Sequence, residues 1–161
     1  HPKAYFFVNG EGDVEENLHQ LTKEVRRAPM DVALIGIGEN GHIAFNDPPA
    51  DFDTEEAYMV VELEERCKKQ QMGEGWFATI DDVPDRAITM TVNQIMKSRV
   101  ILSVVPGKRK AEAIKMTIEA AEITNQVPAT RLREHPDWIL YLDEDSASMV
   151  DRTKLEQIHN H

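Results

Sequence analysis

Residues 36–49, GIGENGHIAFNDPP, follow an apolar run at 32–35 and combine glycines with a histidine, a carboxylate and two prolines. The first six residues satisfy G-x-G-x-x-G, a pattern that binds the pyrophosphate of a dinucleotide. That use requires a helix of several turns behind the glycines, because the helix N-terminus holds the phosphates. Pro48 disfavours helical backbone at Asp47, and neither Pro48 nor Pro49 can donate a backbone hydrogen bond. The segment therefore predicts a tight turn, and we expect no dinucleotide cofactor.

The rest of the chain alternates apolar runs with helical patterns, which is typical of an α/β domain with a parallel sheet. The patterns predict strands at 4–8, 32–35, 58–63, 100–105 and 138–142, and helices at 15–27, 64–71, 91–98, 108–121, 127–130 and 145–150. The run at 32–35 is continuously apolar, as in a strand buried on both faces. We expect one Rossmann-like α/β domain over residues 1–161, with a parallel sheet flanked by helices. Because the chain opens abruptly at His1-Pro2, we also expect it to be part of a longer polypeptide.

Charge and composition restrict the partners. The 161 residues carry a formal net charge of −11, which disfavours nucleic acid and anionic membranes as partners. No apolar run has the length of a membrane span, and Cys67 is the only cysteine, so neither a disulfide framework nor a thiolate metal cluster is expected. A cytoplasmic protein is the simplest interpretation. An anionic substrate would need a locally basic pocket in so acidic a chain.

A histidine in a turn behind a buried strand can be catalytic. Ligands of open α/β sheets bind at the carboxyl ends of the strands, where His42 and Asp47 are expected to lie. Imidazole accepts and donates protons near neutral pH, and a neighbouring carboxylate would orient it. From spacing alone, a histidine that only hydrogen-bonds the loop backbone explains the pattern equally well.

The motif resembles the signature of the glucosamine-6-phosphate deaminase/isomerase family, in which a glycine-rich turn runs into G-H-I-A-F-N and an acid followed by proline. The related 6-phosphogluconolactonases share the G-H but continue differently. The resemblance extends through VPDRAITMTVNQIM (83–96), VVPGKRKAEAI (104–114) and LREHPDWILYLDEDSA (132–147). It covers nearly the whole chain and corresponds to the later portion of family members. The opening strand–helix units of the family fold are expected to be missing.

The resemblance implies a role for several residues. His42 would open the sugar ring by proton transfer at the ring oxygen, and Asp47 would assist it. Gly36 and Gly38 would offer backbone groups to the substrate.

Two further residues would bind the substrate phosphate. Arg66 and Lys110 match the family's phosphate-binding cations, and a guanidinium suits phosphate geometrically. The alternatives are an exposed helical Arg66 that pairs with Glu62, and a solvated basic patch around Lys110.

Three departures from the family pattern bear on the reaction. Asn40 stands where an aspartate pairs with the histidine, so we expect slower ring opening or a different substrate. Asp47 is one methylene shorter than the family's glutamate. No residue matches the early aspartate that acts as the family's base at carbon 2.

The resemblance therefore implies an amino-sugar-phosphate isomerase or deaminase that needs neither metal nor organic cofactor and acts on a phosphorylated amino sugar or a related sugar phosphate. It is compatible with a homo-oligomer. A sugar-phosphate-binding or regulatory protein without turnover, and a 6-phosphogluconolactonase-like hydrolase, remain as alternatives.

Overall fold

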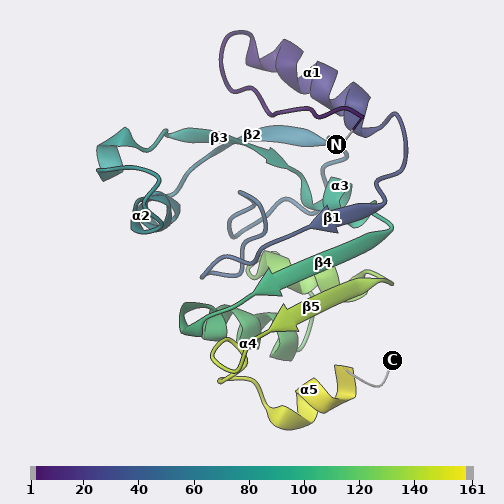
Figure 1. Cartoon of the computed structure of the whole chain (residues 1–161), viewed down its shortest axis with the longest axis vertical. Helices are drawn as coiled ribbons and strands as arrows, with labels where there is room; N and C mark the ends of the chain where they lie inside the picture. Colours follow the sequence, from purple (N-terminus) through teal and green to yellow (C-terminus); the bar gives the residue numbers. More distant parts are fainter. Residues whose placement is uncertain (1–2, 159–161) are drawn as a thin grey trace.

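The computed structural model describes residues 3–158, apart from the side chains of Arg66 and of residues 156–158. Its elements, in chain order, are α1 (Val14–Val25), β1 (Val32–Leu34), β2 (Tyr58–Glu62), α2 (Glu65–Gly73), η1 (Ile80–Asp82), β3 (Arg86–Met90), α3 (Val92–Met96), β4 (Val100–Val105), η2 (Lys108–Lys110), α4 (Ala111–Glu119), η3 (Pro128–Glu134), β5 (Trp138–Leu142) and α5 (Arg152–Ile158). The strands form a parallel sheet, β1-β4-β5, and a separate antiparallel pair, β2-β3 (Figure 1). The predicted α/β class is confirmed.

The parallel sheet brings three loops to one edge. Central strand β4 pairs with β1 through Ala33 and Ile101, and with β5 through Ile101 and Trp138. Because all three strands run in the same direction, the loops that follow them leave from the same edge. These loops are the glycine turn after β1, residues 106–110 after β4, and the turn that starts at Asp143 after β5.

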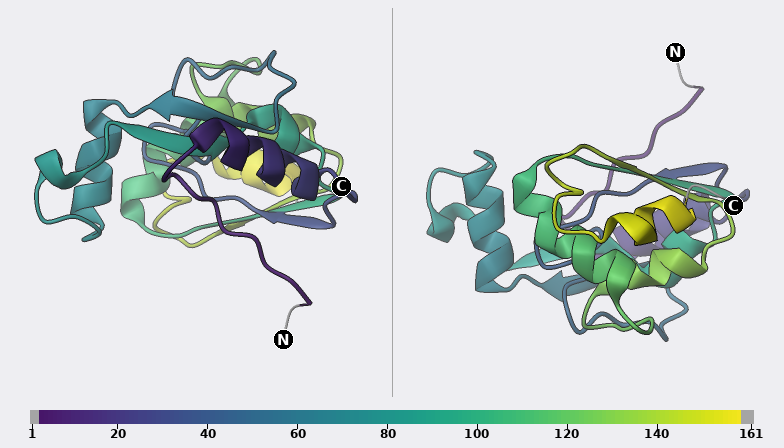
Figure 2. Two further views of the ribbon diagram at one scale, coloured as in Figure 1. Left: turned by 90° about the horizontal axis from the view of Figure 1, so that it is seen from above. Right: turned by 90° about the horizontal axis from the view of Figure 1, so that it is seen from below.

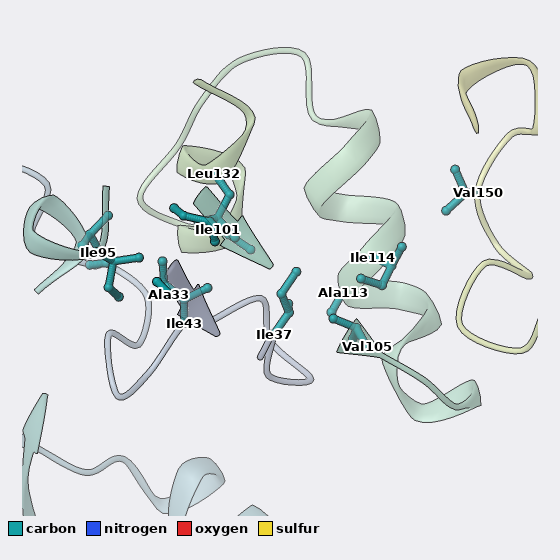
Figure 3. Close-up of a cluster of buried hydrophobic side chains, with 13 residues drawn as sticks. Ala33, Ile37, Ile43, Ile95, Ile101, Val105, Ala113, Ile114, Leu132 and Val150 are labelled. Atoms are coloured by element: carbon teal, nitrogen blue, oxygen red, sulfur yellow. The ribbon is translucent and has the colours of Figure 1, made fainter. Parts of the chain in front are cut away.

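One face of the sheet packs into an apolar core. Figure 2 shows α4 and α5 on the same side of the sheet, and the side chains between these layers form the cluster in Figure 3. Ile101 and Ile114 are fully buried there, and Val105 is 2% exposed. Ile37 and Ile43, from the glycine turn, belong to the same cluster. The turn is therefore anchored to the core by its own apolar residues.

The opposite face of the sheet is uncovered within the described part of the chain. Leu34 is 77% exposed and Val104 is 65% exposed, and Ile139 and Tyr141 are exposed beside them. The prediction that residues 32–35 are buried on both faces is wrong. Side chains alternate along a strand, and only Ala33 of β1 points toward the helices.

Two other sequence predictions are wrong. The strand expected at 4–8 is irregular backbone, and Asn17 in α1 holds the segment that follows it by donating to the carbonyls of Asn9 and Glu11. The helix expected at 145–150 is a series of turns, because the Asp143 side chain accepts the amide of Ser146 at 2.7 Å. The final helix starts later, at Arg152.

The antiparallel pair β2-β3 was only half predicted. Strand β2 is confirmed, whereas β3 was not predicted although it pairs with β2 over all five of its residues. Helices α1, α2, α3 and α4 and the short η3 were each predicted within a few residues of their observed ends. None of the described helices is both long and apolar enough to cross a bilayer.

Candidate functional site

The glycine turn between β1 and Asp47 is held by backbone hydrogen bonds. The amide of Gly38 donates to the carbonyl of His42 at 2.8 Å, and the amide of Gly41 donates to Gly38 at 3.0 Å. Gly41 has a φ of 84°, which favours glycine, and a Cβ there would lie 2.7 Å from Cγ1 of Val127. The backbone turns at residues 39–41 instead of entering a helix, as the prolines predicted.

Gly38 makes room for the imidazole of His42. A Cβ on Gly38 would lie 2.2 to 2.4 Å from three atoms of the imidazole ring, so the ring rests directly on the glycine backbone. Gly36 differs, because a Cβ there meets nothing within 4 Å. The structure thus gives Gly38 a packing role, and the substrate contacts of both glycines stay predictions.

Asn46 connects the end of the glycine turn to strand β3 through hydrogen bonds. It is 2% exposed, and its Nδ2 donates to the carbonyls of Ile43 and Met90, both at 2.9 Å. The amide of Phe45 donates to Oγ1 of Thr89, again across to β3. The site therefore depends on β3, the strand that sequence patterns did not predict.

Asn40, His42 and Asp47 lie together in a hydrogen-bonded group. Nδ1 of His42 lies 2.6 Å from Oδ1 of Asn40 and 3.1 Å from Oδ1 of Asp47. Asn40 Oδ1 also accepts the backbone amide of His42, and Asn40 Nδ2 donates to Asp47 Oδ1 at 2.9 Å.

These bonds determine the tautomer of His42. Both oxygens near Nδ1 are acceptors, so Nδ1 carries the proton and Nε2 keeps a free lone pair. A neutral histidine held in this form can accept a proton at Nε2 while the Asp47 carboxylate balances the resulting charge. The alternative of a histidine that bonds only the loop backbone does not describe this site.

The carboxylate of Asp47 is kept ionised. Burial raises its pKa, but hydrogen bonds from His42 and Asn40, the charge on His42 and the thiol of Cys67 together bring the pKa below its ordinary value. Asp47 therefore stays negative in the pH range in which imidazole titrates, and can stabilise a protonated His42.

Cys67 is a site residue that sequence reasoning missed. It is 3% exposed, lies in α2, and reaches the carboxylate of Asp47. Burial and the neighbouring carboxylate raise the pKa of the thiol to about 11, so it stays protonated near neutral pH. A cysteine in an otherwise polar helix was the available signal, but its position next to the motif depends on tertiary packing.

A cavity of about 180 Å³ opens over this group, at the carboxyl edge of the sheet. The glycine turn, α2 and η2 contribute its lining, namely Glu39, Asn40, His42, Cys67, Lys69, Gln70 and Arg109. Arg109 Nη2 lies 2.6 Å from Glu39 Oε1 across the cavity. Two cations, Lys69 and Arg109, line this cavity together with the carboxylate of Glu39. The basic pocket for an anionic substrate stays a prediction.

The two predicted phosphate-binding residues lie in neighbouring elements. Arg66 is in α2, directly before Cys67, but its side chain is outside the described part of the structure. Lys110 is half-buried at the junction of η2 and α4, and the residue before it, Arg109, lines the cavity instead. The phosphate contacts of Arg66 and Lys110 stay predictions.

The loop that carries Arg109 is fixed from β5. Both carboxylate oxygens of Asp143 accept the amide of Gly107, at 2.9 and 3.1 Å. The amides of Ser146 and Gly107 lower the pKa of Asp143. Asp143 is thus a structural carboxylate that holds η2 at the sheet edge.

Over residues 3–158, no three histidine, cysteine, aspartate or glutamate side chains come together in a way that suits a metal ion. In the group of His42, Asp47 and Cys67, the raised pKa of the thiol keeps its proton in place, which makes it a poor metal ligand.

Comparison with known proteins gives consistent matches. The family model for glucosamine-6-phosphate isomerases and 6-phosphogluconolactonases matches residues 4–140. The glucosamine-6-phosphate deaminase of Thermoanaerobacter pseudethanolicus is 39% identical over 147 residues, which is 91% of this chain and 56% of that protein. The deaminase of Exiguobacterium sibiricum is 38% identical over 148 residues, covering 92% and 57%. The chain thus spans a little over half the length of these relatives.

Solved structures of two of these kinds of protein also superpose on this chain. A monomeric glucosamine-6-phosphate deaminase superposes with a TM-score of 0.81 at 36% identity, covering 89% of this chain and 58% of that one. The 6-phosphogluconolactonase of Thermotoga maritima superposes with a TM-score of 0.62 at 18% identity, covering 84% and 54%, which shows a shared fold.

Proposed function

Because the chain belongs to the family of glucosamine-6-phosphate isomerases and 6-phosphogluconolactonases, we propose that it binds a phosphorylated amino sugar and opens its ring for isomerisation and deamination. The observation that carries this proposal is the 2.6 Å contact from Nδ1 of His42 to Oδ1 of Asn40, which leaves Nε2 as a base. The names of the relatives support glucosamine 6-phosphate as the substrate, with fructose 6-phosphate and ammonia as products.

Ring opening is the step that the arrangement supports. Nε2 of His42 takes the proton of the anomeric hydroxyl as the carbonyl forms at carbon 1. The bond from carbon 1 to the ring oxygen breaks, and the imidazolium returns the proton to that oxygen. Asp47 stabilises the imidazolium in between, with its Oδ1 3.1 Å from Nδ1. Asn40 fixes the ring orientation but brings no charge.

Cations at the cavity would hold the phosphate. Arg109 and Lys69 line it, and Arg66 and Lys110 come from the adjoining α2 and η2. Gly36 and Gly38 would present backbone groups to the sugar.

A sugar-phosphate-binding protein without turnover is the second candidate. Asn40 favours it, because an amide replaces the charge that would stabilise the imidazolium.

Ammonia release from glucosamine 6-phosphate tests the proposal. We expect ammonia and fructose 6-phosphate in equal amounts from the protein, and a loss of about 100-fold or more in His42→Gln. His19→Gln, on the exposed surface of α1, is the matched control and keeps full activity. Binding of the sugar phosphate without ammonia would favour the second candidate. Hydrolysis of 6-phosphogluconolactone in place of deamination would instead place the chain with the lactonases.

A further inference from the structure

We propose that Glu39 is an internal competitor for the phosphate group: it holds the guanidinium of Arg109, and a phosphate monoester binds by displacing it. The inference rests on the proposed function and assigns Arg109, a residue outside the predicted site, to phosphate binding. It also makes Glu39 a determinant of how tightly the anion is held.

The first observation is the position of the ion pair. Arg109 Nη2 and Glu39 Oε1 lie 2.6 Å apart, and both side chains line the cavity that contains His42. Glu39 belongs to the turn after β1 and Arg109 to the turn after β4, and these two strands are hydrogen-bonded neighbours. The pair therefore bridges the edge of the sheet within the cavity that His42 also lines.

The second observation is the position of the Arg109 guanidinium relative to α2. Arg109 Nη2 lies 3.9 Å from the position that a Cβ on Gly73 would take, at the last residue of α2. The C-terminus of a helix carries partial negative charge, which favours a cation there. Arg109 thus spans from η2 to the C-terminal end of α2, with its guanidinium close to Gly73.

The third observation is that the pair is open to exchange. The Arg109 side chain is 66% exposed and that of Glu39 is 30% exposed. Solvent-exposed ion pairs contribute little stability, whereas a phosphate dianion offers more charge and a bidentate match to guanidinium. A phosphate can therefore replace the carboxylate at Arg109 without disrupting the fold.

Two other donors near the edge are already engaged. Lys69 Nζ pairs with Glu65 Oε1 at 2.7 Å along α2, and the amide of Gly107 is held by Asp143. Arg109 is thus the cation whose partner, Glu39, lies inside the cavity. Release of Arg109 from Glu39 breaks one exposed ion pair.

Titration with inorganic phosphate, followed by calorimetry, tests the inference. We expect Arg109→Gln to weaken phosphate binding by about tenfold, because a hydrogen bond between charged groups is lost. Glu39→Gln should tighten it by about threefold, as is typical of exposed charge pairs. The double variant should match Arg109→Gln alone, because Glu39 acts only through Arg109. Arg99→Gln and Glu55→Gln, from exposed ion pairs elsewhere, are the charge-matched controls and should leave the affinity unchanged.

Several results would overturn the inference. They are equal affinities in Arg109→Gln and the unaltered protein, a Glu39→Gln variant that binds no tighter than its control, or a Glu39→Gln variant that binds no phosphate. Circular dichroism of every variant checks that the fold is retained. The titration does not depend on turnover. A protein that shows this binding pattern but releases no ammonia would therefore disprove the proposed reaction, while the competition of Glu39 with phosphate for Arg109 would still hold.

Discussion

Asn40 and Asp47 are joined by a hydrogen bond of 2.9 Å from the amide Nδ2 to the carboxylate Oδ1, and together they hold Nδ1 of His42. Both residues depart from the family pattern described above, in which two carboxylates accompany the histidine. In this chain the amide at position 40 donates to the shorter carboxylate at position 47. The two departures therefore fit each other, and the negative charge next to Nδ1 of His42 comes from Asp47.

This pairing makes Asn40→Asp harmful, although the substitution restores the residue usual in the family. Two carboxylate oxygens would face each other at the present 2.9 Å separation, with one donor lost. We expect a loss of about 1–3 kcal/mol in the free energy of unfolding at neutral pH, measured by urea denaturation. The exchanged variant, Asn40→Asp with Asp47→Asn, should recover most of that loss. If it is no more stable than Asn40→Asp, the two positions are not coupled.

Asp47 should also make stability depend on acid pH. Its folded pKa lies below the ordinary value of 3.8, so the unfolded chain binds the proton more readily. The contribution of Asp47 is therefore complete above the unfolded pKa and is lost as the pH falls through the folded pKa. Urea denaturation between pH 6 and pH 2, roughly the span over which carboxyl groups titrate, measures it. Asp47→Asn should show a shallower acid decline than the exposed control Asp53→Asn, and parallel curves would contradict the assignment.

Gly38 and Gly36 should respond differently to alanine. A Cβ on Gly38 would overlap the imidazole of His42, whereas the same atom on Gly36 meets open space. We expect Gly38→Ala to cost about 1–3 kcal/mol of unfolding free energy, as overpacked sites do, and to change the imidazole resonances of His42. Gly36→Ala is the matched control and should leave those resonances in place. Similar spectra for both variants would mean that the imidazole does not rest on Gly38.

Alanine substitutions on the two faces of the sheet should differ in their effect on the free energy of unfolding. Val105 is 2% exposed and its neighbour Val104 is 65% exposed, on opposite sides of β4. Val105→Ala should cost about 2 kcal/mol, and Val104→Ala less than about 1 kcal/mol, because only the first removes buried methyl groups. Thermal and urea denaturation measure both. Equal losses would mean that the outer face is covered as well.

The sequence predicted the parts of the site that are local in the chain. Asn40, His42 and Asp47 lie within eight residues, and the pattern of glycines and prolines restricts the backbone between them. Their meeting could therefore be expected before any tertiary structure was known.

The remaining site residues come together through tertiary packing. Cys67 reaches Asp47 because of the way α2 packs, and Arg109 meets Glu39 because β1 and β4 are neighbours. No spacing in the sequence encodes either contact. Strand β3 was missed because its partner β2 lies more than twenty residues earlier, across α2 and η1.

Burial was the least predictable property of the strands. The apolar composition of β1 is that of a strand covered on both faces, yet Val32 and Leu34 are exposed in the described chain. An apolar run gives the character of a strand but not the layers that cover it.

The state of His42 in the presence of glucosamine 6-phosphate tests the central claim most directly, because it reports on the base and on the ligand together. Long-range ¹H–¹⁵N spectra of the imidazole distinguish the two neutral tautomers. We predict that the free protein holds its proton on Nδ1, and that glucosamine 6-phosphate shifts the Nε2 resonance in a saturable manner. A proton on Nε2 in the free protein, or an Nε2 resonance that does not change up to millimolar glucosamine 6-phosphate, would contradict the account.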